Sequence, residues 1–136
     1  MNIMVQLEFD GQCRQAFEYY AQVLKGEIKV MNSFGDETAL PPGSKPASPE
    51  RIRFAQLKVG DNVIQGNDLP AGEYKEKRGF NVALHVSHAA EARRIFNALA
   101  AGGRIDTPLS EVAWSSAFGI VRDRFDTPWL ILALDK

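Results

Sequence analysis

The chain has 136 residues, of which 45% are hydrophobic and 24% are charged, and its 16 basic and 17 acidic residues give a formal net charge of −1. Because basic residues are scattered and no apolar run approaches the ~20 residues needed to cross a bilayer, neither a nucleic acid nor a membrane is an expected partner. The single cysteine, Cys13, excludes an intrachain disulfide, and the first six residues lack the pattern of a secretory signal, so we expect a cytoplasmic protein.

The first segment, residues 3–9, alternates between apolar and polar side chains, as in a strand with one packed and one open face. The packed face contains Val5, Leu7 and Phe9, and the open face contains Met4, Gln6 and Glu8. After Gly11 the pattern changes to the period of a helix that ends before Gly26. Its apolar stripe, Ala16, Phe17, Tyr20, Val23 and Leu24, should cover the packed face of the strand.

Three further extended segments are predicted in the first half, at residues 27–34, 51–59 and 62–67. Gly60 and Asp61 indicate a tight hairpin between the last two. Residues 35–50 contain four prolines and are predicted to form an exposed loop, of a kind that in some proteins closes over a ligand.

The second half repeats this order. Residues 80–86 alternate, with Phe80, Val82, Leu84 and Val86 on the packed face. A helix follows that we expect Ser87 to cap, with Glu91 in its first turn and Gly102 after its end. Extended segments are then predicted at residues 104–111, 113–122 and 128–134. Each half therefore has the order strand, helix and three strands.

The two halves are related by a constant offset. Adding 77 to positions 5, 7 and 9 gives 82, 84 and 86, all apolar, and the same offset pairs Met4 with Asn81, Gln6 with Ala83 and Glu8 with His85. The sequence thus predicts a single α+β domain over residues 1–136. It consists of two βαβββ modules, residues 1–69 and 78–136, which shape a cup for a small molecule.

This tandem arrangement resembles the vicinal oxygen chelate superfamily, which includes glyoxalase I, bleomycin-resistance proteins and extradiol dioxygenases. Residues 9–20 (FDGQCRQAFEYY), 25–27, Trp114 and 118–129 (FGIVRDRFDTPW) resemble its PhnB-like branch, also described as 3-demethylubiquinone-methyltransferase-like. The resemblance implies mixed or antiparallel sheets that form a cup-shaped half-barrel, helices on the outside and association into a homodimer. Arg124 and Asp126 replace the usual proline and glycine of the last turn, where Asp tolerates left-handed backbone.

Metal-dependent members of the superfamily carry ligands on the first and last strands of each half. The resemblance puts Met4, Asn81 and Leu130 at three of these positions and either Gln65 or Asn67 at the fourth, while Phe54 stands where PhnB-like sequences often have histidine. Thioether and aliphatic side chains do not replace the imidazole and carboxylate ligands of a divalent ion, so we expect no metal and no cofactor. A carboxylate site built from Asp36, Glu37 or Asp68 remains an alternative.

Two groups of residues could give the cup its chemistry. Glu8 and His85, at equivalent positions, form a candidate general-base pair that requires contact directly or through one water; the alternative is an ordinary polar contact at strand ends. Trp114, Phe118 and Trp129 are either an aromatic wall for a ligand or residues of the core or of a dimer interface.

We therefore expect a metal-free small-molecule-binding protein. The candidate ligand-binding residues are Met4, Gln6, Phe54, Gln65, Asn67, Asn81, Trp114, Phe118, Trp129 and Leu130. The alternative is an enzyme, either a metal-dependent lyase or dioxygenase with displaced ligands or an acid–base catalyst that uses Glu8 and His85. A methyltransferase is disfavoured because the sequence has no glycine-rich strand-to-helix loop followed by an acidic residue on the next strand.

Overall fold

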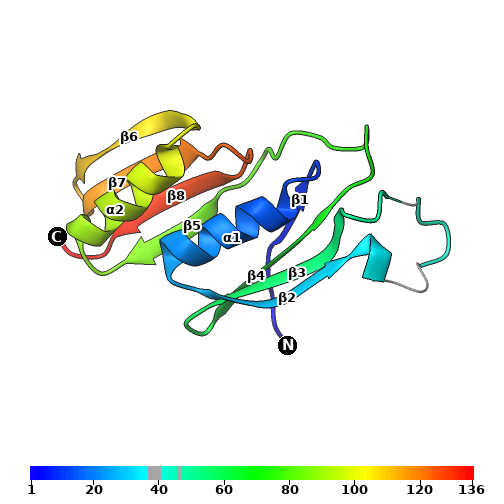
Figure 1. Ribbon diagram of the computed structural model, residues 1–136. Coiled ribbons are helices and arrows are strands. Elements are labelled where there is room, and N and C mark those ends of the chain that lie inside the picture. Colours follow the sequence, from blue (N-terminus) through cyan, green and yellow to red (C-terminus); the bar gives the residue numbers. More distant parts are fainter. Residues whose placement is uncertain (37–40, 46) are drawn as a thin grey trace. The chain divides into compact units, whose positions relative to one another are not determined.

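The computed structural model describes residues 1–36, 41–45 and 47–136, which divide into two compact units, residues 1–75 and 76–136 (Figure 1). The described part of the first unit contains β1 (Gln6–Phe9), α1 (Cys13–Leu24), β2 (Glu27–Ser33), a short 3₁₀ helix (Phe34–Asp36), β3 (Ile52–Val59) and β4 (Asn62–Asp68). The second unit contains β5 (Val82–Val86), α2 (Ala89–Ala100), β6 (Arg104–Val112), β7 (Ser115–Arg122) and β8 (Pro128–Ala133).

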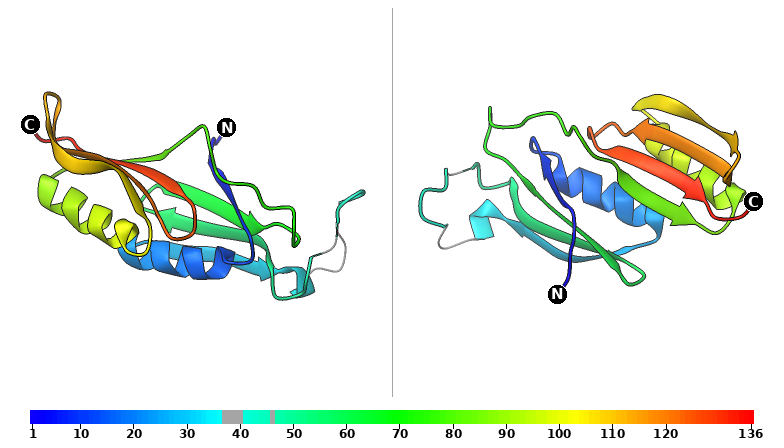
Figure 2. Two further views of the ribbon diagram at one scale, coloured as in Figure 1. Left: turned by 90° about the horizontal axis from the view of Figure 1, so that it is seen from above. Right: turned by 180° about the vertical axis from the view of Figure 1, so that it is seen from behind.

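Each unit forms its own mixed sheet with a helix on one face, as the views in Figures 1 and 2 show. The strand orders are β1-β4-β3-β2 and β5-β8-β7-β6. The first and last strands of each unit pair in parallel, and the remaining neighbours pair antiparallel. The predicted α+β class and the repeated βαβββ order are therefore confirmed. None of the helices formed by the described residues has the length and apolar character needed to cross a membrane.

The parallel pairs fix which residues are equivalent in the two units. Gln6 pairs with Gln65 on β1 and β4, and Ala83 pairs with Leu130 on β5 and β8. Since Gln6 and Ala83 are related by the 77-residue offset, Gln65 is the counterpart of Leu130. This register decides between Gln65 and Asn67, the two positions that the sequence left open.

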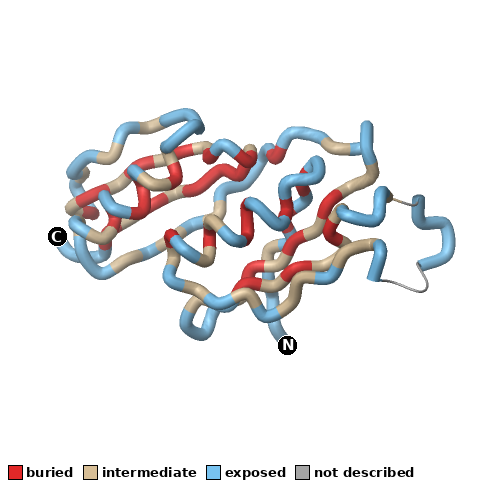
Figure 3. The backbone as a smooth tube through the Cα atoms, viewed as in Figure 1, coloured by how far each residue is buried: buried red, intermediate tan, exposed pale blue. Residues whose placement is uncertain are grey.

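The core of the first unit lies between α1 and the sheet (Figure 3). Phe17 of α1 packs directly on Gly66 of β4, where an added Cβ would lie 2.7 Å from the Phe17 ring. A glycine is needed there because the helix approaches the sheet so closely. The fully or almost fully buried side chains of this core include Leu7, Phe9, Cys13, Ala16, Tyr20, Ala55 and Leu57. The predicted stripe of α1 is thus confirmed, except that Leu24 is only half-buried.

The second unit has a similar close contact at a different position of its sheet, since Phe96 of α2 packs on Gly119 of β7, where an added Cβ would lie 2.8 Å from the ring. Two local expectations are wrong. His88, not Ser87, is the N-cap of α2, and it forms no side-chain capping hydrogen bond. Phe80 lies before β5 and is 40% exposed, so it does not join the packed face.

A buried carboxylate, Asp68, holds three segments of the first unit together. Its Oδ1 accepts hydrogen bonds from the backbone N–H groups of Gly11 (2.9 Å) and Cys13 (3.0 Å), and its Oδ2 accepts one from Ile52 N–H (2.7 Å). The side chain is 1% exposed. Asp68 therefore joins the end of β4 to the start of α1 and the start of β3.

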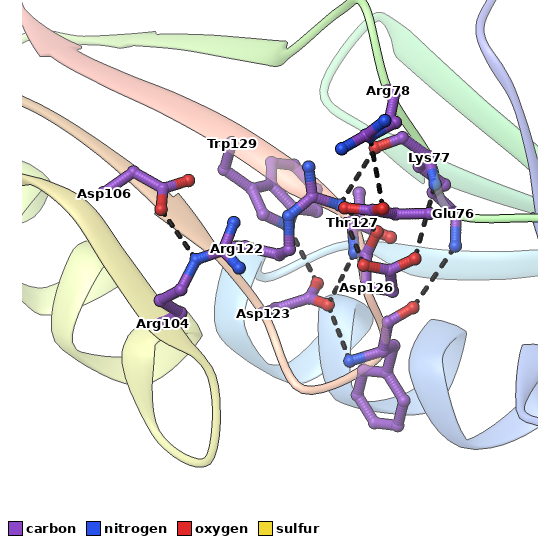
Figure 4. A network of polar contacts seen from close by, with 11 residues as sticks. Glu76, Lys77, Arg78, Arg104, Asp106, Arg122, Asp123, Asp126, Thr127 and Trp129 are labelled. Atoms are coloured by element: carbon purple, nitrogen blue, oxygen red, sulfur yellow. Dashed lines mark hydrogen bonds and ion pairs between the residues drawn. The ribbon is translucent and has the colours of Figure 1, made fainter.

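A second buried aspartate, Asp123, orders the β7–β8 turn (Figure 4). Its carboxylate accepts hydrogen bonds from the N–H groups of Phe125 and Thr127 and from the indole N–H of Trp129. Asp126 has a left-handed backbone (φ 69°), as predicted for the position where relatives have glycine. Its carboxylate also accepts a hydrogen bond from Arg122 Nη1 at 2.8 Å, which stabilises this turn.

Replacement of Asp68 with alanine should lower the free energy of unfolding by about 3 kcal/mol, because three buried N–H donors would lose their acceptor. Chemical denaturation followed by circular dichroism measures this value. The matched control is Glu18→Ala, since Glu18 is an exposed carboxylate on α1. Equal stabilities of the two variants would contradict the assigned role of Asp68.

Candidate ligand-binding site

A row of four amide side chains crosses the face of the first sheet opposite α1. Gln6, Gln65 and Gln56 are paired across β1, β4 and β3, and Asn67 follows two positions after Gln65 on the same face. We call Gln56, Gln65, Gln6 and Asn67 the amide ladder. Gln6 is exposed and the other three are half-buried, so the ladder lies at the surface of the sheet.

Hydrogen bonds connect the four side chains in a single chain, in which each amide N–H group donates to the next acceptor. Gln56 Nε2 donates to Gln65 Oε1 (3.2 Å), and Gln65 Nε2 donates to Gln6 Oε1 (2.9 Å). Gln6 Nε2 donates to Asn67 Oδ1 (2.7 Å), and Asn67 Nδ2 donates to the backbone oxygen of Asp68 (3.4 Å). Because a primary amide has two N–H donors and two acceptor lone pairs, each member retains capacity for a further partner.

The positions of the second sheet that are equivalent to the ladder are apolar, and His85 is a polar neighbour on the same face. Ala83 and Leu130 correspond to Gln6 and Gln65, Ile120 pairs with Leu130 as Gln56 pairs with Gln65, and Leu132 corresponds to Asn67. Phe118 pairs with Leu132, and its ring meets that of Trp114 edge-on at a centroid distance of 6.0 Å. The two sheets therefore present equivalent positions with opposite polarity.

A hollow of about 460 Å³ opens in the first unit at the Asn67 end of the ladder. Its lining includes Phe34, Lys45, Arg53, Asn67, Leu69 and Pro70. The ammonium group of Lys45 forms an ion pair with Glu73, and the hydrogen bond to this carboxylate raises the pKa of Lys45. The hollow thus combines apolar walls with amide, cationic and acidic groups, as small-molecule sites commonly do.

A family model described as 3-demethylubiquinone-9 3-methyltransferase matches residues 1–132. The chain belongs to this family. It is 29% identical to the Protein YjdN of Escherichia coli (strain K12) over 96% of this chain and 94% of that protein. The crystal structure of PA1353 from Pseudomonas aeruginosa has 35% identity and a TM-score of 0.90, and the match covers 100% of this chain and 99% of that one.

More distant structures share the fold. The "putative 3-demethylubiquinone-9 3-methyltransferase, PhnB protein" of Bacillus cereus has 18% identity and a TM-score of 0.81, with 98% and 99% of the chains covered. A "glyoxylase/bleomycin resistance protein/dioxygenase domain" from Frankia sp. EAN1pec has 16% identity and a TM-score of 0.63, with 98% and 95% covered. The resemblance to the PhnB-like branch of the glyoxalase and bleomycin-resistance fold is therefore confirmed.

Three of the predicted site residues, Gln6, Gln65 and Asn67, come together in the ladder. Gln56 was missed, although its position between the apolar Ala55 and Leu57 indicates that it points to the open face. The other predicted residues of the first unit lie near the ladder or before it. Phe54 is half-buried on β3, Glu8 is exposed opposite Asn67 on β1, and Met4 is 39% exposed before β1.

In the second unit, Trp129 adopts the core alternative, since it is fully buried and its indole N–H donates to Asp123 Oδ2 at 2.8 Å. Trp114 is 65% exposed, and Phe118 and Leu130 are half-buried on the apolar face. Asn81 and His85 are exposed. The pairing of Glu8 with His85 joins residues of different units and stays a prediction.

The superfamily metal positions hold residues with unsuitable donors in this chain. Gln65, the residue that the register assigns to one position, has its amide oxygen in the ladder, and its counterpart Leu130 has no donor atom. Among residues 1–36, 41–45 and 47–136, no three histidine, cysteine or acidic side chains gather to hold a metal ion. The chemistry of this donor set does not fit the superfamily metal centre.

The alternative metal site built from Asp36, Glu37 or Asp68 is not supported by the contacts of Asp36 and Asp68. Asp68 uses both oxygens for backbone N–H groups. Asp36 accepts a hydrogen bond from Ser33 N–H at 3.0 Å, and this bond lowers the pKa of Asp36. Glu37 lies outside the described residues.

Purified protein should contain only substoichiometric Zn, Ni, Mn and Fe after dialysis, because amide and aliphatic side chains bind these ions poorly. Inductively coupled plasma mass spectrometry measures the content. Dialysis against each metal salt, followed by dialysis against buffer, is the matched control for metal lost during purification. One retained equivalent of any of these ions would contradict the assignment.

Proposed function

We propose that this protein is a metal-free small-molecule-binding protein that recognises its ligand with the amide ladder. The observation that carries this proposal is the chain of hydrogen bonds from Gln56 to Asn67 on an open sheet face. Mutual hydrogen bonds restrict the rotamers of these side chains before a ligand arrives, and such preorganisation lowers the entropic cost of binding. A planar ligand with alternating donors and acceptors suits such a row.

The ladder also has a structural role that any test must separate from binding. Cross-strand side-chain pairs stabilise a sheet by roughly 0.2–1 kcal/mol each. If this were the whole role of the ladder, its loss would lower stability equally with and without a ligand. Binding predicts an additional loss that depends on ligand concentration.

The descriptions of the family and of a fold relative name both enzymes and a bleomycin resistance protein. We favour binding for this chain because the metal positions lack suitable donors and because Gln6, Gln65 and Asn67 are neutral at every physiological pH. The enzymatic alternatives are a metal-dependent lyase or dioxygenase with displaced ligands and an acid–base catalyst that uses Glu8 and His85.

A thermal-shift screen of metabolites, S-adenosylmethionine and divalent ions should identify a stabilising metabolite, whereas the ions and S-adenosylmethionine should have no effect. At a concentration about 100-fold above Kd, a ligand stabilises the native state by about 2.7 kcal/mol. Gln65→Leu, which introduces the residue found at the equivalent position 130, should weaken binding about tenfold.

The control for this screen is Gln22→Leu, because Gln22 is exposed on α1, which packs on the opposite face of the sheet. Unchanged affinity in Gln65→Leu, or stabilisation by divalent ions alone, would refute the proposal.

The predicted proximity of Glu8 and His85 can be tested with the double variant Glu8→Cys/His85→Cys. Cys13 is fully buried and can stay in place. A short bis-maleimide should cross-link the two thiols, because long side chains in hydrogen-bond contact hold their Cβ atoms farther apart than the ~3.5–4.5 Å that a disulfide requires. Glu18→Cys/His85→Cys is the control and should give no cross-link.

A denaturing gel separates the two forms of this cross-link. A monomer band means a link within one chain, and a dimer band means a link between the two copies of the proposed homodimer. Equal cross-linking in the test and control variants would remove the Glu8–His85 pair from consideration.

A further inference from the structure

Arg53 places a guanidinium group at the hollow beside the ladder. Arg53 lines the hollow, its Nε atom is buried, and its Cζ lies 5.8 Å from the centroid of the Phe54 ring. A guanidinium group has five N–H donors in a planar fork, so it can hold an anion in addition to other contacts. Its partly buried position increases the strength of such an interaction relative to bulk water.

Both acidic side chains that line the described part of the hollow have partners, and Glu8 is exposed opposite Asn67. Asp68 directs its two oxygens to the backbone N–H groups of Gly11, Cys13 and Ile52. Glu73 forms an ion pair with Lys45. Arg53 adds a positive charge to the lining, together with the neutral amide of Asn67.

The remaining walls are apolar and close to this polar end. Phe34, Pro41, Leu69 and Pro70 contribute to the lining, and Phe34, Leu69 and Pro70 are half-buried. A volume of about 460 Å³ suits a small organic molecule rather than a single ion. One end of the hollow thus suits an anionic group, and the rest suits a short hydrocarbon.

We propose that this hollow binds a small organic anion, with its carboxylate or phosphate group at Arg53 and Asn67 and its apolar part against Phe34 and Leu69. The inference rests on the proposed function, because it names the ligand class and the place where the ladder ends. Ser44, which also lines the hollow, provides a hydroxyl donor for the same anionic group.

Isothermal titration calorimetry of the full chain with acetate, butyrate and monobutyl phosphate tests this proposal. Butyrate should bind more tightly than acetate because its hydrocarbon contacts the apolar walls, and butanol and butylammonium should not bind. Arg53→Gln should weaken the binding of butyrate or monobutyl phosphate at least about tenfold, as expected when a charged hydrogen bond is lost. The stronger of these two probes shows which anionic group the hollow prefers.

Arg93→Gln, which changes an exposed arginine of α2, is the matched control and should bind like the wild type. The order acetate, butyrate and butanol is measured on the wild type, so the test stays valid if Arg53→Gln does not fold. Equal binding of butanol and butyrate, or undiminished affinity in a folded Arg53→Gln variant, would overturn the proposal.

The same measurements separate this inference from the proposed function. If a neutral metabolite binds in a Gln65-dependent manner and no anion binds, the anion proposal is refuted and the proposed function stands. If anions bind through Arg53 but Gln65→Leu does not weaken any ligand, the hollow is confirmed and the amide ladder loses its assigned role.

Discussion

The parallel pairing of β1 with β4 is the constraint on which the first unit depends. It places Gln6 beside Gln65, although the two residues are 59 positions apart, and the antiparallel β3 then adds Gln56 to the same row. Asp68 fixes the end of this arrangement because its carboxylate holds the starts of α1 and β3. A slip of one residue would turn the amides into the core and bring Leu7 to the surface.

The two sheets have the same strand order and each has a helix on one face, but the side chains on their opposite faces differ. Each helix packs a phenylalanine on a strand glycine, although Gly66 on β4 and Gly119 on β7 are not at equivalent positions. The opposite faces differ, with amides at positions 6 and 65 and aliphatic side chains at positions 83 and 130. The side chains that pack against the helices maintain the fold, so the side chains on the opposite faces can differ. At these positions the first sheet has hydrogen-bonding amides and the second has aliphatic side chains.

Much of this fold follows from the sequence because alternation and helical period are local signals. Residues 3–9 and 80–86 indicate both first strands, and the offset between them reveals the repeat. The register of β4 could not be predicted, because a parallel pair between distant segments leaves no local pattern. Trp129 was ambiguous because its burial depends on Asp123, and the Ser87 cap failed because helix ends are set by a few backbone angles.

The hollow could not be predicted at all. It depends on how Phe34, Lys45 and Leu69, which are distant in sequence, fold around Arg53. Composition identifies none of these residues as part of a site, since single arginines and phenylalanines are common on protein surfaces. Gln56, in contrast, could have been found from its place in an alternating strand.

Recognition by amides instead of a metal is most directly tested by NMR of the side-chain NH₂ groups in ¹⁵N-labelled protein. The account predicts that a stabilising small molecule shifts the NH₂ signals of Gln6, Gln56 and Gln65, while the signal of Gln22 stays in place. Binding that moves none of the three ladder glutamines, or that appears only when a divalent ion is added, would contradict it.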